Sequence, residues 1–213
     1  MTKTVLLYGD SIIWGVDASI GGRHQREHRV NTIVQNNLGP EVEVIGEGHR
    51  GRTMFGENGA FPKRNGLEQF GPIFASHLPI DILVIMLGTN DVNAKTRHSA
   101  GDIARALDDY MREAKEWCDF MGYDMPKVLI VSPPDIEESS LVRFAELFAG
   151  SAELIGGVVD ALREYADTHG YMFLDSRLVT RSVGTDGIHL DRDNTKKLAD
   201  SITKELQKVL ASL

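Results

Sequence analysis

The stretch LLYGDSIIWG (residues 6–15) passes from an apolar run into Gly-Asp-Ser and returns at once to apolar side chains. The run TVLLYG (4–9) combines β-branched and other apolar residues and ends at a glycine, which is typical of a buried strand. In open α/β sheets, ligands bind beyond the carboxyl ends of the strands. The stretch therefore predicts a strand that places a serine hydroxyl at the edge of a sheet.

Five strand-like runs alternate with helical patterns, which favours parallel βαβ units over a sandwich or a bundle. DILVIML (81–87) and KVLIVS (127–132) are almost entirely apolar, as expected for central strands covered on both faces. The other runs are TVLLYG (4–9), VEVIGE (42–47) and YMFLD (171–175), and helical patterns cover 29–38, 101–122, 146–169 and 193–212. We expect one α/β domain over residues 1–213.

Two segments do not fit this alternation. Residues 48–75 are rich in Gly, Arg and Asn and long for a connection, so we expect a functional loop there. The segment DIEESSLVRFAELFAG (135–150) carries more apolar residues than a free loop needs. Its apolar side chains either form an interface or pack on the chain's own core as a helical stripe, namely Leu141, Phe144, Leu147 and Phe148.

Composition narrows the function classes. With 42% hydrophobic and 25% charged residues among 213, the chain has the composition of a soluble globular protein. Its formal net charge of -8, without a local cluster of Lys and Arg, argues against binding to nucleic acid. No apolar run is long enough to span a membrane or to act as a signal peptide, so we expect no membrane partner and a cytoplasmic location.

The polar motifs follow the predicted strands. The second strand leads into GEGHRGRT (46–53), the third into GTND (88–91), and the fifth is followed by TDGIH (185–189). Because parallel strands end at one edge of a sheet, we expect these loops to converge with Gly-Asp-Ser of the first strand.

Those residue types suit acyl transfer. The Ser11 hydroxyl is a weak nucleophile that needs an adjacent base held by a third group, and His189 with Asp186 three residues earlier can supply both. Backbone N–H groups in glycine-bearing turns and a carboxamide are suitable donors to an oxyanion, which suggests Gly51 and Asn90. No cofactor is expected.

Each motif alone has a simpler explanation as a turn or a helix cap. The coincidence of all four at one sheet edge favours a site. One alternative is a metal-dependent phosphoesterase in which Asp10, Asp91 and Asp186 join His189 as ligands. Another is a binding module that keeps the fold without turnover.

GDS, a loop glycine after the second strand, GTND and the pattern DxxH stand in the order found in SGNH hydrolases, also called GDSL-like esterases. The resemblance spans residues 9–189, with Ile12 in place of the leucine of the GDSL name. YGDSIIWG, HLPIDILVIMLGTND, KVLIVSPP and DGIH resemble the arylesterase and acyltransferase branch, whose members form oligomers and act on small acyl esters.

The resemblance implies a three-layer α/β/α fold with a flavodoxin-like strand order 2-1-3-4-5. It assigns Ser11 as nucleophile and backbone oxyanion donor, with Asp186 and His189 completing the triad. Asn90 would be the side-chain donor and Gly51 the second backbone donor. Gly51 is preferred to Gly48 because the family glycine usually stands two residues before a threonine, here Thr53.

The substrate is expected to be an acyl ester of a small aryl, alkyl or sugar alcohol. Apolar residues beside the motifs would narrow the acyl pocket and favour acetyl groups, although Trp14 and Ile188 could equally be only packed. The expected substrate-binding residues are Asp10, Trp14, Val92 and Ile188. The resemblance also implies a homo-oligomer and possible acyl transfer to alcohols or peroxide.

Overall fold

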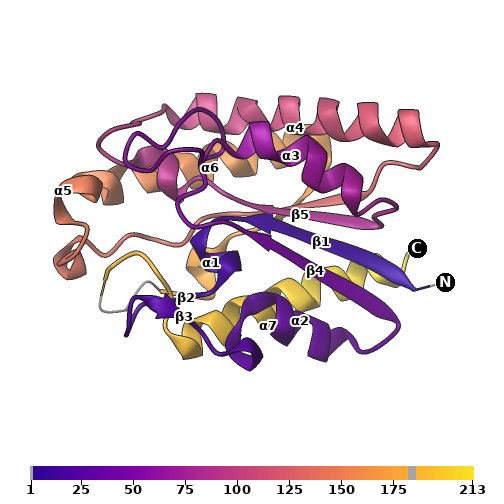
Figure 1. The fold of residues 1–213 in the computed structure, drawn as a ribbon, viewed down its shortest axis with the longest axis horizontal. Coiled ribbons are helices and arrows are strands. Elements are labelled where there is room, and N and C mark those ends of the chain that lie inside the picture. The colour runs from indigo at the N-terminus through magenta and orange to yellow at the C-terminus, as the bar shows by residue number, and fades with distance from the viewer. Residues whose placement is uncertain (1, 182–185) are drawn as a thin grey trace.

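The computed structural model of the protein describes residues 2–181 and 186–213. A parallel sheet of five strands lies at its centre, in the order β4-β1-β5-β6-β7 (Figure 1). Along the chain this is the order 2-1-3-4-5, so the expected topology is confirmed. The strands are β1 (Lys3–Gly9), β4 (Val42–Gly48), β5 (Ile82–Met86), β6 (Lys127–Val131) and β7 (Met172–Leu174).

Helices cover both faces of this sheet, which gives three layers (Figure 1). Along β1, Val5 and Leu7 belong to the apolar cluster on one face, whereas Leu6 and Tyr8 belong to the cluster on the other. This separation follows from the two-residue period of a strand. One face carries α2 (Val30–Leu38) and α7 (Arg192–Leu210), and the other carries α3 (Gly66–Ser76), α4 (Ala100–Met121) and α6 (Ser151–His169).

The ends of the long helices follow from single residues. Ser99 caps α4 by accepting from the Asp102 backbone N–H, and Asp191 caps α7 by accepting from that of Asn194. Gly122, in the left-handed conformation that glycine adopts without strain, ends α4.

Helix α3 lies largely inside the segment 48–75, so the expectation of a loop throughout that segment is wrong. Pro72 and two glycines disguise the helical pattern, because these residue types disfavour helices. Asn65 nevertheless caps the helix, and Phe70 and Phe74, one turn apart, are fully buried in the core.

The expected helix 146–169 is also wrong as a single element. It is divided into α5 (Ala145–Phe148) and α6, and Gly150 between them adopts φ +74°. Leu141 and Phe148 are buried in the chain's own apolar cluster, and Phe144 and Leu147 pack against it. These four apolar side chains of segment 135–150 therefore contribute to this chain's core without forming one continuous helix, whereas Val142 is exposed.

Short elements complete the chain. They are α1 (Ser11–Trp14), the antiparallel pair β2 (Val16–Asp17) and β3 (Gly22–Arg23), and the 3-10 turns Arg26–His28, Thr89–Val92, Glu138–Ser140 and Ser176–Leu178. The five strands of the sheet run parallel, and β1, β4 and β5 end at the edge on the left of Figure 1, while both chain ends lie on the right. The loops that follow the strands meet at that left edge.

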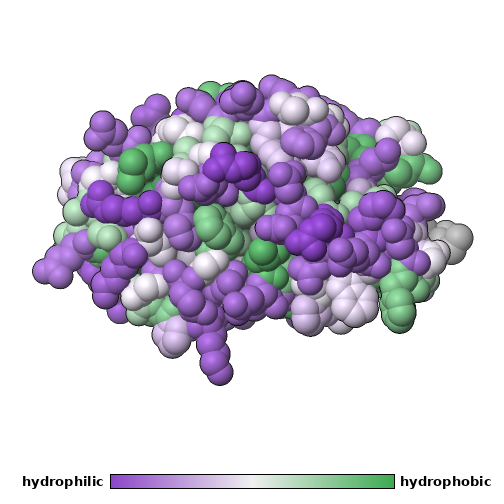
Figure 2. All heavy atoms as spheres, turned by 90° about the horizontal axis from the view of Figure 1, so that it is seen from above, coloured by the Kyte–Doolittle hydropathy of each residue, from purple (hydrophilic) through white to green (hydrophobic). Residues whose placement is uncertain are grey.

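The outer surface over α3, α4 and α6 is mostly hydrophilic, with separate hydrophobic patches (Figure 2). Within residues 2–181 and 186–213, no helix combines the length and apolarity needed to cross a bilayer.

Arg52 holds the carboxyl edge of the sheet together. Its guanidinium donates to the carbonyl oxygens of Gly9 at the end of β1 and Glu47 in β4, and to the Gln69 side chain of α3. It also lies over the Tyr8 ring, 4.2 Å from the centroid. The side chain is only 2% exposed and has no carboxylate partner within the described part of the chain.

Replacing Arg52 by Met should therefore lower the free energy of unfolding by about 3 kcal/mol, since buried carbonyl groups would lose their donors. Urea unfolding followed by circular dichroism measures this. The matched control is Arg105→Met, because Arg105 is exposed and, among the described residues, forms an ion pair only with Asp102 on its own helix. Its change should stay within about 0.5 kcal/mol. Equal stabilities for the two variants would contradict the role given to Arg52.

Candidate active site

The nucleophile candidate Ser11 is the first residue of α1, directly after β1. Asp10 is the N-cap, and its carboxylate accepts from the Ile12 backbone N–H at 2.9 Å. A helix leaves its first N–H groups without partners, and that of Ser11 has no acceptor among the described residues. Gly9 permits this tight turn, because a Cβ there would lie 2.4 Å from Ile13 Cγ1.

Ser11, His189 and Asp186 form a continuous chain of hydrogen bonds. His189 Nδ1 lies 2.7 Å from Asp186 Oδ2, and Nε2 lies 2.8 Å from Ser11 Oγ. When Nδ1 donates to the carboxylate, Nε2 is free to accept from the serine hydroxyl. All three residues are buried, although 178 positions of sequence separate Ser11 from His189.

The turn that carries Asp186 and His189 is held by the same carboxylate. Asp186 Oδ1 accepts from the backbone N–H groups of Ile188 and His189 at 3.1 and 2.9 Å. Burial opposes ionisation, but the hydrogen bonds and charge of His189 outweigh it, so the pKa of Asp186 lies below its ordinary value. Asp186 therefore stays ionised and orients the imidazole. Thr185, the first residue of the TDGIH motif, lies outside the described residues.

Asp10 is the second carboxylate next to the nucleophile. Burial raises the pKa of its carboxyl to about 6, although the Ile12 N–H and the nearby His189 act in the opposite direction. Its other oxygen lies 3.5 Å from the Asn90 amide nitrogen. Asp10 thus helps to position both the turn that carries Ser11 and the Asn90 side chain.

Ser11, Gly51 and Asn90, the three residues expected to supply the oxyanion donors, line one cavity. The Asn90 amide donates to the Arg52 carbonyl at 3.0 Å. Gly51 adopts φ +74°, and the Asn58 amide donates to its carbonyl at 2.9 Å. Gly48 instead pairs with Gly9 in the sheet and does not line the cavity.

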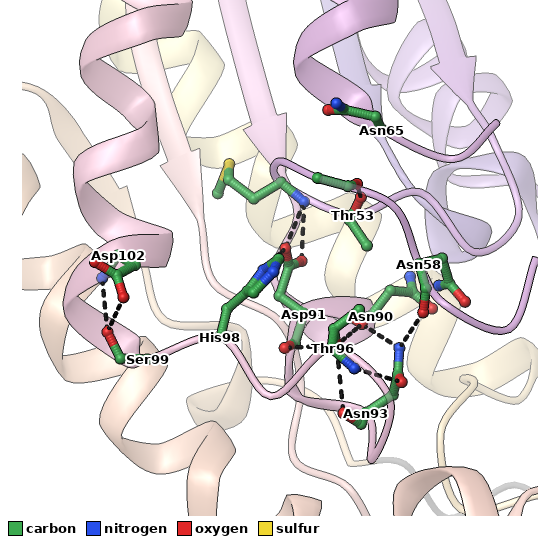
Figure 3. Close-up of polar contacts among 12 residues, drawn as sticks. Thr53, Asn58, Asn65, Asn90, Asp91, Asn93, Thr96, His98, Ser99 and Asp102 are labelled. Atoms are coloured by element: carbon green, nitrogen blue, oxygen red, sulfur yellow. Dashed lines mark hydrogen bonds and ion pairs between the residues drawn. The ribbon is translucent and has the colours of Figure 1, made fainter. Parts of the chain in front are cut away.

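Asp91 fixes the Asn90 turn to the loop after β4 (Figure 3). Both of its oxygens lie 2.9 Å from the Met54 backbone nitrogen, and His98 Nδ1 lies 3.4 Å from one of them. Burial raises the pKa of Asp91 in spite of these contacts. The sequence alone indicates Asp91 only as a turn residue or a metal ligand.

Asn93 and Thr96 extend this connection (Figure 3). The Asn93 amide donates to the carbonyl oxygens of Asn90 at 2.6 Å and of Asn58 at 3.2 Å. The Thr96 hydroxyl lies 2.9 Å from the Asp91 carbonyl. The backbone that carries Asn90 is therefore held on both sides.

The cavity has a volume of about 250 Å³. Its remaining walls are largely apolar, with two cationic side chains, and consist of Arg50, Phe61, Arg64, Phe144, Leu147, Phe148 and Ile188. Of the four residues expected to contact substrate, only Ile188 is among them. Asp10 and Val92 are each 1% exposed and lie behind the wall, and Trp14 contacts Arg23 and Arg50.

The sequence does not single out Arg50, Phe61 or Arg64, because they belong to an irregular loop whose path follows no hydrophobic period. The sequence predicts Phe144, Leu147 and Phe148 only as core or interface residues. The sole signal for the arginines was their presence in a glycine-rich segment next to a motif.

The carboxylates of the metal alternative do not converge. Asp10 faces the Ile12 N–H, Asp91 faces Met54 and His98, and Asp186 faces His189. Across the described ranges, no group of three or more His, Cys, Asp or Glu side chains has an arrangement suited to a metal ion.

Comparisons with known proteins point to one family. The model of the GDSL-like Lipase/Acylhydrolase family matches residues 7–199. No curated protein sequence matches the chain. Many solved structures do resemble it.

Three of these structures illustrate the likeness. A carbohydrate acetylesterase family member from Sinorhizobium meliloti has a TM-score of 0.90 and 32% identity, over 98% of this chain and 99% of that one. The aryl esterase of M. smegmatis has a TM-score of 0.91 and 30% identity, over 97% and 99%. A putative arylesterase from Agrobacterium tumefaciens C58 has a TM-score of 0.87 and 30% identity, also over 97% and 99%.

The family match covers most of the chain, and the likeness to esterases extends over nearly its whole length. The family and enzyme class expected from the sequence motifs are thereby confirmed. The chain belongs to the GDSL-like lipase/acylhydrolase family, and it is a carboxylic ester hydrolase.

Proposed function

We propose that the protein is a serine esterase that cleaves short-chain acyl esters, above all acetyl esters, of small aryl, alkyl or sugar alcohols. The observation that carries this proposal is the 2.8 Å contact between Ser11 Oγ and His189 Nε2 in the wall of a small, largely apolar cavity. The likeness to a carbohydrate acetylesterase and to aryl esterases supports the substrate class.

In the first step, Ser11 Oγ attacks the ester carbonyl carbon while His189 Nε2 takes the hydroxyl proton. The oxyanion that forms accepts from the N–H groups of Ser11 and Gly51 and from the Asn90 amide. Asp186 stabilises the imidazolium. His189 then gives the proton to the departing alcohol, which leaves an acyl group on Ser11.

In the second step, His189 takes a proton from a water molecule whose oxygen attacks the acyl carbon. The bond from that carbon to Ser11 Oγ then breaks, His189 returns the proton to Ser11 Oγ, and the acid product leaves. Any small nucleophile can replace water here. The half-buried Phe144 and Leu147 in the cavity wall favour an apolar acceptor over bulk water. Acyl transfer to small alcohols, or peracid formation with hydrogen peroxide, is the second activity that we propose.

Ser11→Ala and His189→Ala should each lower kcat/KM for 4-nitrophenyl acetate by at least about a thousandfold, because the members of a triad act as a unit. The double variant should be little worse than either single one. Ser212→Ala, at an exposed serine next to the C-terminal residue and outside the cavity lining, is the control and should keep full activity.

Two outcomes would contradict the assignment. Equal rates for the wild type and Ser11→Ala would favour a binding module with adventitious hydrolysis. Loss of activity after exhaustive chelation, with recovery on adding a divalent cation, would favour the metal-dependent alternative. Circular dichroism spectra establish that each variant is folded.

The partition between water and alcohol tests the second activity. With an activated acetyl ester and benzyl alcohol in water, the fraction of benzyl acetate among the products should exceed the mole fraction of the alcohol severalfold, as quantified by gas chromatography. Acetate as the sole product would rule out the transferase activity and leave the esterase proposal intact.

The raised pKa of Asp10 predicts that the difference in stability between Asp10→Asn and the wild type depends on pH. Its pKa is about 6 in the folded protein against an ordinary value of 3.8, so ionisation of Asp10 destabilises the fold. This cost is absent below about pH 4 and complete above about pH 6. Asn carries no charge, so the stability of Asp10→Asn relative to the wild type should increase by about 3 kcal/mol between pH 4 and pH 7.

Urea unfolding at a series of pH values measures this difference. Asp167→Asn, at an exposed position of α6, is the matched control. A pH-independent difference between Asp10→Asn and the wild type would show that burial does not hinder the ionisation of Asp10.

A further inference from the structure

The charged side chains in the cavity wall, apart from the catalytic histidine, are both cations. They are Arg50 and Arg64, from the loop between β4 and α3. Neither has a carboxylate within 4.0 Å among the residues that the structure describes. The chain has 31 acidic and 23 basic residues, so two unpaired arginines beside the nucleophile are not explained by a general excess of positive charge.

Arg64 is held in place with part of its donor capacity unused. Its Nη1 donates to the carbonyl oxygens of Pro62 and Lys63 at 3.1 and 3.3 Å. Its Nε is buried and has no partner in the described structure. That atom lies 3.7 Å from where a Cβ on Gly51 would stand, which places the unused N–H beside a proposed oxyanion donor. A buried donor without a partner is costly until an acceptor arrives.

Arg50 is oriented but not neutralised. Its guanidinium lies over the Trp14 ring, 5.4 Å from the centroid. Trp14 is fixed in turn by Arg23, whose Nε donates to the Trp14 carbonyl at 2.7 Å. An aromatic ring attracts a cation without cancelling its charge. Arg50 therefore presents a full positive charge at the cavity.

We propose that Arg50 and Arg64 form an anion subsite, and that the preferred substrates are small esters that carry a carboxylate. The planar guanidinium fork matches a carboxylate, and a partly enclosed cavity strengthens the attraction relative to water. This inference rests on the proposed esterase function and specifies its substrate class. The carboxylate could belong to the acyl part or to the alcohol part of the ester, and the two arms of the experiment distinguish these.

The experiment compares matched anionic and neutral esters. For the alcohol part, the pair is 4-acetoxybenzoate and methyl 4-acetoxybenzoate. For the acyl part, the pair is phenyl hydrogen succinate and methyl phenyl succinate, each corrected for its uncatalysed rate. The readout is the ratio of kcat/KM for the anionic ester to that for its neutral partner, which cancels effects of a variant on the catalytic step itself.

In at least one arm, the ratio should fall tenfold or more in the variant carrying both Arg50→Gln and Arg64→Gln. Arg64→Lys, which keeps the charge without the fork, should lie between this variant and the wild type. Arg112→Gln, at an exposed arginine of α4, should leave both ratios unchanged. In the wild type, the same ratio should fall as sodium chloride is raised, because salt screens the attraction; this readout needs no variant.

Unchanged ratios in both arms, together with no effect of salt on the wild type, would overturn the anion subsite while the neutral esters are still hydrolysed in a Ser11-dependent way. If the wild type hydrolyses none of the four esters faster than Ser11→Ala, the esterase proposal fails and the subsite fails with it. The two failures are therefore distinguishable.

Discussion

The buried guanidinium of Arg52 is the interaction on which the site depends. At the carboxyl edge of a parallel sheet the strands diverge, so the backbone carbonyl groups there no longer accept hydrogen bonds from the neighbouring strand. Arg52 supplies donors to the ends of β1 and β4 and connects both to α3. Its own carbonyl accepts from Asn90. One residue thus joins the framework to Asn90, the proposed side-chain donor to the oxyanion.

Three carboxylates hold the loops of the site in place. Asp10 caps the turn that presents Ser11, Asp91 connects the Asn90 turn to Met54, and Asp186 closes the turn that carries His189. Two of these groups have raised pKa values, because their position in the interior is unfavourable for a charge. The burial of these two carboxylates destabilises the fold, whereas their hydrogen bonds fix the geometry of the loops of the site.

The long elements were predictable from the sequence because each depends on a continuous apolar run or a regular stripe. The central strands of 81–87 and 127–132 and the helix that became α7 are of this kind. Helix α3 was not recognised, since Pro72 and two glycines hide its pattern, and the break at Gly150 depends on a single dihedral angle. The contact between Ser11, His189 and Asp186 was predictable because parallel strands end at one edge of a sheet, where the loops that carry these residues meet. The loop GEGHRGRT (46–53) could not be interpreted in the same way. Arg50 lines the cavity and Arg52 lies in the interior. Nothing in the local sequence pattern distinguishes these two arginines.

Both chain ends lie at the amino edge of the sheet, across the molecule from the cavity (Figure 1). Any sequence joined to either end, whether a purification tag, a fusion partner or a tether to a solid support, therefore starts far from the route by which an ester enters. A protein attached to a surface through its N- or C-terminus would turn the edge of the sheet that carries the cavity towards the solution, so immobilisation at either end keeps the entrance open to the liquid phase.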